Sequence, residues 1–98
     1  MNKISGIGNF TSKTEKNDVS YIVNDKVFLI EHLSSNGEIK TIEIRTDNNL
    51  KNVLKERFES VMDSRYFGRG GIEIVMSGQL TSEDIDDLIR LSYNLTKQ

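Results

Sequence analysis

Cysteine, proline and tryptophan are absent from the 98-residue sequence, and histidine occurs once. Without cysteine, the chain can form neither disulfides nor thiolate zinc sites, and it has no cysteine nucleophile. The absence of proline is compatible with helices and strands that run without kinks. No apolar stretch approaches the roughly 18 residues of a transmembrane helix, and the N-terminus lacks the apolar run of a signal peptide. These absences predict a cytoplasmic protein that does not enter a membrane.

The sequence also lacks a basic excess. It has 13 lysines and arginines against 15 aspartates and glutamates, a formal net charge of -2. A domain that binds the phosphate backbone non-specifically usually carries a clear basic excess. Basic residues are nevertheless frequent between residues 47 and 69, whereas acidic residues dominate from residue 70 onward. If the chain has an anion-binding face, we therefore expect it within residues 47–69.

The first half of the chain predicts strands joined by tight turns. Residues 1–18 are polar and small, which predicts an N-terminal arm without regular structure, so that residues 19–98 form the single folded domain. Asn24-Asp25 separates two β-rich runs, and Asn36-Gly37 separates two more. Both pairs tolerate positive φ and are typical of hairpin turns. At this chain length the core is thin, and oligomerisation would add to its stability.

The second half changes to a helical period. Asp47 is a candidate N-cap, and the apolar residues that follow, as far as Val61, predict a helix. We expect a loop over residues 63–71 and a short strand over residues 72–75. Thr81 or Ser82 would cap a last helix that has an acidic first turn.

These elements predict an α+β domain with the order β-β-β-α-β-α. In this prediction an antiparallel sheet of about four strands carries both helices on one face. Its other face is open to solvent or to a partner.

The segment from Lys26 to Leu95 resembles the MmcQ/YjbR family. The resemblance rests on three segments: Lys26-Val27-Phe28-Leu29-Ile30, an Asp-led helix from Asp47 to Ser60, and, most specifically, the closing segment Leu88-Ile89-Arg90-Leu91-Ser92-Tyr93-Asn94-Leu95. It implies a CyaY-like (frataxin-like) fold and a DNA-binding function. Relative to that family the chain is truncated at the N-terminus, where a first helix is missing. The uncovered sheet surface would favour a homodimer or a tightly bound protein partner.

One loop carries the residue types that a binding site for nucleic acid needs, namely Arg65-Tyr66-Phe67-Gly68-Arg69-Gly70-Gly71. Arginine pairs bidentately with phosphate, aromatic rings stack on bases, and glycine lets a ligand approach the backbone. With the neighbouring cations, the predicted nucleic-acid or partner surface comprises Arg65, Tyr66, Phe67, Arg69, Lys51, Lys55 and Arg57. In the alternative interpretation, the aromatic rings pack in the core and the arginines are solvated.

No other segment predicts a catalytic or metal-binding site. The acidic residues Glu83, Asp84, Asp86 and Asp87 fit an acidic helix start better than a cation site. His32 has no second ligand nearby in sequence, which favours an ordinary strand or turn histidine. The sequence therefore predicts a non-enzymatic DNA-binding module without cofactor or metal. The alternative is a protein-interaction domain, such as a small inhibitor or adaptor that binds another protein.

Overall fold

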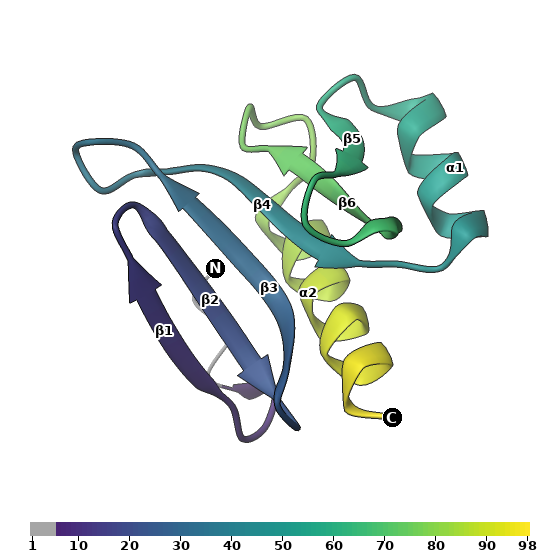
Figure 1. Cartoon of the computed structure of the whole chain (residues 1–98). Helices are drawn as coiled ribbons and strands as arrows, with labels where there is room; N and C mark the ends of the chain where they lie inside the picture. The colour runs from purple at the N-terminus through teal and green to yellow at the C-terminus, as the bar shows by residue number, and fades with distance from the viewer. Residues whose placement is uncertain (1–5) are drawn as a thin grey trace.

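The computed structural model describes residues 6–98 and shows one antiparallel sheet and two helices in them (Figure 1). The strands and helices have the following bounds: β1 Thr11–Glu15, β2 Asp18–Val23, β3 Lys26–Leu33, β4 Ile39–Arg45, α1 Asn48–Arg57, β5 Val61–Ser64, β6 Gly68–Val75 and α2 Ser82–Lys97. The order of strands in the sheet is β1-β2-β3-β4-β6-β5. Residues 1–5, part of the predicted N-terminal arm, lie outside the described residues.

The predicted sheet of about four strands with two helices packed on one face is wrong, because the sheet has six strands within residues 6–98. The additional strands are β1, from the predicted arm, and β5, which starts at Val61, where helix was expected, and runs into the predicted loop. All five residues of β1 are exposed, so no apolar alternation marks this strand. β6 begins at Gly68, and its glycines carry no strand propensity of their own. The observed order is therefore β-β-β-β-α-β-β-α.

Short-range turn and capping signals are confirmed. Asn24 and Asp25 both have positive φ, 52° and 64°, and connect β2 to β3. The Asp47 carboxylate caps α1 by accepting a hydrogen bond from the Leu50 N–H at 2.8 Å. The Thr81 hydroxyl caps α2 by accepting one from the Asp84 N–H at 3.1 Å. Each cap satisfies a backbone donor that the helix itself leaves free.

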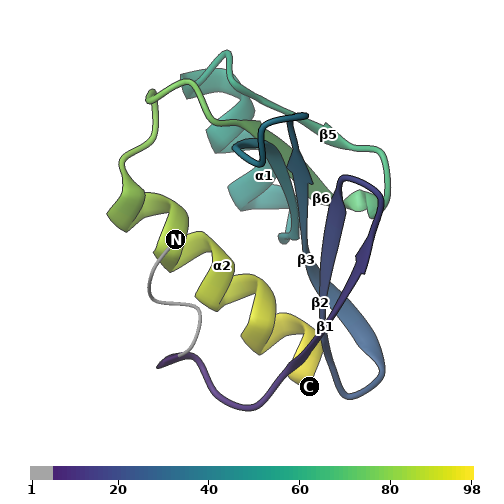
Figure 2. The same cartoon turned by 90° about the vertical axis from the view of Figure 1, so that its left-hand side faces the viewer.

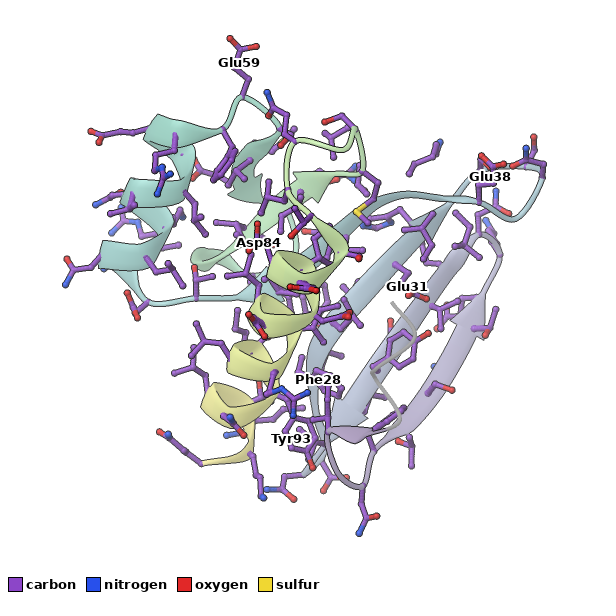
Figure 3. All side chains as sticks on the ribbon, turned by 180° about the vertical axis from the view of Figure 1, so that it is seen from behind. Phe28, Glu31, Glu38, Glu59, Asp84 and Tyr93 are labelled. Carbon is purple, nitrogen blue, oxygen red and sulfur yellow. The ribbon has the colours of Figure 1, made fainter. Side chains whose placement is uncertain are left out.

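α2 lies across one face of the sheet, over β3 and β4 (Figure 2). The core between them includes isoleucines that alternate along two neighbouring strands: Ile42 and Ile44 in β4, Ile72 and Ile74 in β6. Tyr93 of α2 packs edge-to-face on Phe28 of β3 with ring centroids 5.1 Å apart, as Figure 3 shows. Burial of each such side chain stabilises the fold by about 1.5–3 kcal/mol.

The other helix, α1, contacts β5 and β6 at one edge of the sheet, and its Leu54 side chain is buried. Side chains alternate along strands, so β3, β4 and β6 present a second set of residues on the face opposite α2. We call this the outer face. Within residues 6–98, neither helix has the length and apolar character that a membrane crossing requires.

Candidate functional site

Two buried carboxylates lie next to each other on the outer face. Glu43 of β4 and Glu73 of β6 are direct partners in the β4–β6 ladder. Each stands between two isoleucines that point into the core, and the exposed fractions of the two glutamates are only 2% and 4%. Like charges directly opposite each other destabilise a sheet, so both carboxylates require cationic or hydrogen-bonding partners.

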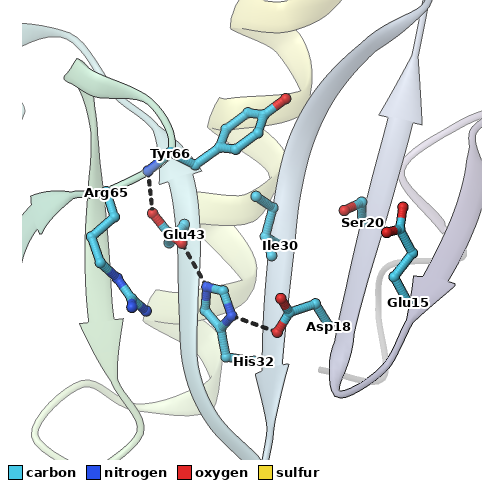
Figure 4. Close-up of a pocket in the computed structure, with 8 residues that line it drawn as sticks. All are labelled: Glu15, Asp18, Ser20, Ile30, His32, Glu43, Arg65 and Tyr66. Carbon is cyan, nitrogen blue, oxygen red and sulfur yellow. Dashed lines mark hydrogen bonds and ion pairs between the residues drawn. The ribbon is translucent and has the colours of Figure 1, made fainter.

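Residues of β3 and of the segment around the end of β5 form hydrogen bonds with the Glu43 carboxylate; Figure 4 shows those with His32 and Tyr66. Its Oε1 accepts hydrogen bonds from the Ser64 hydroxyl at 2.7 Å and from the Tyr66 N–H at 2.8 Å. Its Oε2 lies 2.5 Å from Nε2 of His32. Burial alone would raise the pKa of Glu43, but these three hydrogen bonds outweigh it and hold the pKa below its usual value. Glu43 therefore stays ionised and fixes the backbone after β5.

His32 bridges two carboxylates on neighbouring strands. Its Nδ1 lies 2.8 Å from Oδ1 of Asp18, its partner in the β2–β3 ladder, and its Nε2 faces Glu43. Burial alone would lower the pKa of His32, but the two carboxylates favour the imidazolium ion and raise the pKa above its usual value. A continuous polar chain, Asp18–His32–Glu43, thus crosses β2, β3 and β4.

Glu73 is paired with Arg65, one of the residues predicted to bind phosphate. Nε and the terminal Nη2 of Arg65 each donate a hydrogen bond of 2.9 Å to a different oxygen of Glu73. This bidentate geometry is the strongest form of arginine–carboxylate pairing. The Arg65 side chain is nevertheless 71% exposed, so its outer side remains accessible.

The aromatic residues of the predicted surface lie on the β5–β6 loop. The Phe67 ring packs over Gly71, where a Cβ would lie only 2.7 Å from Cβ of Phe67. The Arg45 guanidinium lies over the same ring, 4.8 Å from its centroid. Tyr66 packs edge-to-face on Phe67 with centroids 4.9 Å apart and is 59% exposed. We call the group Arg45, Arg65, Tyr66, Phe67 and Arg69 the loop surface.

The lysines predicted for this surface have internal partners. Lys51 is 8% exposed, and its Nζ donates to the carbonyls of Gly68 and Arg69 at 3.3 and 3.4 Å. Lys55 pairs with Asp63 at 2.8 Å, and Lys51 pairs with the same carboxylate at 3.2 Å. Hydrogen bonds from both lysines lower the pKa of Asp63. The structure thus brings Lys51 to the loop surface as a support under the loop.

Arg57, the last predicted cation, lies at the C-terminal end of α1. Its guanidinium carbon is 5.7 Å from the centroid of the Phe58 ring. Among the interactions of residues 6–98, Arg57 contacts Phe58 and no residue of the loop surface.

A pocket of about 380 Å³ opens on the outer face beside Tyr66. Eight residues line it, as Figure 4 shows: Glu15, Asp18, Ser20, Ile30, His32, Glu43, Arg65 and Tyr66. His32, Glu43 and Glu73 bring one imidazole nitrogen and two carboxylate oxygens within 4.8 Å of one another. These three residues could hold a metal ion.

The polar residues of the outer face were not predicted from the sequence. Glu43 and Glu73 each occupy the middle of an Ile-Glu-Ile segment, at residues 42–44 and 72–74. This repeated pattern was an available signal, because a charged residue between two core residues of a strand must face the other side. The pairing of the two segments across the sheet was not visible in the sequence, and neither was the approach of His32.

The fold and the outer face together define an α+β domain with a buried polar cluster beside an aromatic–arginine loop. No protein-family model and no curated protein matches the chain. Among solved structures, the chain is similar to a crystal structure of a protein from Pseudomonas syringae, with a TM-score of 0.72 and 17% sequence identity, covering 89% of this chain and 86% of that one. At this identity the likeness shows the fold alone.

Proposed function

We propose that this chain is a small, non-enzymatic DNA-binding module that contacts DNA through the loop surface. The observation that carries this proposal is the exposed ring of Tyr66, which is held edge-to-face on Phe67 while Arg45 lies over Phe67. Arg69 follows at the start of β6 and is exposed. An exposed aromatic ring among arginines combines base stacking with phosphate contacts.

The loop surface is also held in place before any ligand arrives. The backbone N–H of Tyr66 is fixed by the buried Glu43, and Lys51 binds the carbonyls of Gly68 and Arg69. A loop that is already ordered loses less conformational entropy on binding. The proposal keeps the DNA-binding role expected from the resemblance of residues 26–95 to the MmcQ/YjbR family, and it includes a cytoplasmic location.

The proposal is tested by fluorescence anisotropy with labelled single-stranded and duplex DNA at two salt concentrations. Tyr66→Ala removes the stacking ring and is expected to weaken binding about 5- to 150-fold, as for a loss of about 1–3 kcal/mol per stacked base. Arg69→Ala is expected to weaken binding to all sequences and to reduce the salt slope by about one.

Arg90→Ala is the matched control, because Arg90 is an exposed arginine on α2, away from the loop surface. It should leave affinity and salt slope unchanged. The proposal fails if wild-type protein does not bind DNA at low salt, or if Arg90→Ala weakens binding as much as Arg69→Ala.

A protein partner is the second candidate, and the pocket on the outer face favours it. Glu15 and Asp18 contribute carboxylates to its lining, and Ile30 contributes an apolar surface. Such a pocket suits a lysine or arginine side chain of a partner, and a net charge of -2 weakens attraction to DNA. This candidate predicts no DNA binding at low salt and competition for a bound protein partner by a lysine-rich peptide.

A further inference from the structure

We propose that the outer face contains a binding site for one divalent transition-metal ion, with His32, Glu43 and Glu73 as ligands. Their donor atoms come from three adjacent strands and lie within 4.8 Å of one another. Zn²⁺ bonds to imidazole nitrogen and carboxylate oxygen at about 2.0–2.2 Å, which separates tetrahedral ligand atoms by about 3.4 Å. To reach that spacing, Nε2 of His32 and Oε2 of Glu43, now 2.5 Å apart, would move apart as the ion enters between them.

The surroundings of His32 match those of a histidine that binds a metal. Metal-binding histidines usually donate their other ring N–H to a carboxylate, which fixes the tautomer and turns the remaining nitrogen to the metal. Asp18 occupies that position at 2.8 Å from Nδ1, so Nε2 is the nitrogen that faces the two glutamates.

Glu43 is oriented in the same way by groups that bind only one of its oxygens. The Ser64 hydroxyl and the Tyr66 N–H both donate to Oε1, which leaves Oε2 on the side of His32. Such outer contacts hold a ligating carboxylate in place. Thr41 lies opposite His32 in the β3–β4 ladder, and its buried hydroxyl has no hydrogen-bond partner among residues 6–98.

A divalent ion would keep the charge at the site balanced. The protonated His32 and Arg65 now supply one positive charge each, through their pairs with Glu43 and Glu73, and a divalent ion bound to neutral His32 would supply both from one position. The Arg65 side chain is 71% exposed, so it has solvent to turn into when the ion binds. Two of the three ligands, His32 and Glu43, line the pocket of about 380 Å³, and water there could supply the fourth ligand.

The ligand set selects among metals. One imidazole with two carboxylates suits first-row transition metals such as Zn²⁺, whereas Mg²⁺ prefers oxygen ligands and retains its water. The site goes beyond the proposed DNA-binding function and does not depend on it.

Competition between the full-length chain and a chromogenic Zn²⁺ chelator tests the site. We expect one Zn²⁺ ion per chain, with no displacement by excess Mg²⁺. His32→Asn and Glu73→Gln should each weaken Zn²⁺ binding at least about tenfold, and Asp18→Asn about 10- to 100-fold. Glu83→Gln, at an exposed carboxylate in the first turn of α2, should leave the affinity unchanged.

A measurement on the wild-type chain keeps the test independent of how well the variants fold. On addition of Zn²⁺, the ¹⁵N resonance of His32 Nε2 should shift and the Nε–H signal of Arg65 should change as the arginine leaves Glu73. Absence of Zn²⁺ binding, or Zn²⁺ binding that leaves both signals and all three variants unaffected, would overturn the assignment.

Discussion

Glu43 determines how the β5–β6 loop is held. Its two oxygens engage Ser64, the Tyr66 backbone and His32, and its side chain is almost fully buried. Removing one partner of a buried ion pair leaves an uncompensated charge and costs about 3–5 kcal/mol.

Arg65 holds the neighbouring Glu73 in the same way, so Arg65→Ala would disturb the fold as well as the loop surface. Tyr66 and Arg69 are the better probes of binding.

The Asp18–His32–Glu43 chain predicts a pH dependence of stability. The pKa of His32 is raised in the folded state, so its contribution is complete below its usual pKa of about 6.5 and disappears as pH rises through the folded-state pKa. The difference in unfolding free energy between wild type and His32→Asn should therefore shrink from about pH 6 toward alkaline pH.

Urea unfolding with a chelator present measures this difference. Glu43, whose pKa is lowered, remains ionised over this range. A difference that stays constant or grows as pH rises would show that protonated His32 does not stabilise the folded state.

Gly71 is required by packing on the outer face. A Cβ at this position would collide with the Ile44 carbonyl and with Phe67. Gly71→Ala should therefore destabilise the fold by about 1–3 kcal/mol, the usual cost of overpacking, and should displace the Phe67 ring. Gly70→Ala is the control, since its Cβ would meet only the Phe67 carbonyl at 3.5 Å, an ordinary contact. Thermal unfolding measures the stability of both variants, and equal stability of the two would contradict the packing argument.

At the scale of secondary-structure elements, one buried hydroxyl joins α2 to two strands. Ser92 Oγ donates to the Phe28 carbonyl of β3 at 2.6 Å and accepts from the Arg45 N–H of β4 at 2.8 Å. Ser92→Ala leaves both backbone groups without this partner, and we expect a loss of about 1–3 kcal/mol in unfolding free energy. Asn94→Ala, at an exposed position of α2, should have little effect. Urea unfolding that shows equal effects for both would contradict this role.

Which elements could be predicted depended on whether the signal was local. The caps at Asp47 and Thr81 and the turn at Asn24-Asp25 are short-range features, and the structure confirms them. β1 is exposed along its whole length and pairs with β2, so it has no apolar periodicity to detect. β5 is four residues long and begins in what reads as the end of a helical stripe.

At the scale of the whole molecule, the candidate site combines a local feature with a long-range one. The segment of residues 65–71 was predicted as a candidate site because arginine, aromatic and glycine residues are adjacent in sequence. The carboxylates that anchor it are 30 positions apart in the chain, at Glu43 and Glu73, and meet only through the β4–β6 register. Without that pairing, the lone His32 had no visible partner.

The net charge of the molecule limits how the chain could attract DNA. The net charge is -2, so the proposed attraction to DNA would come from the arginines of the loop surface and not from the molecule as a whole. A contact confined to that group should be small, with a salt slope of about one for each arginine that pairs with a phosphate.

The most direct test is a titration of the ¹⁵N-labelled chain with a short DNA duplex, followed by backbone amide NMR. The account predicts chemical-shift changes centred on residues 64–69 and on Arg45, which diminish as salt is added. Changes centred on α2, or no changes at low salt, would contradict the assignment of the loop surface as the DNA-binding site.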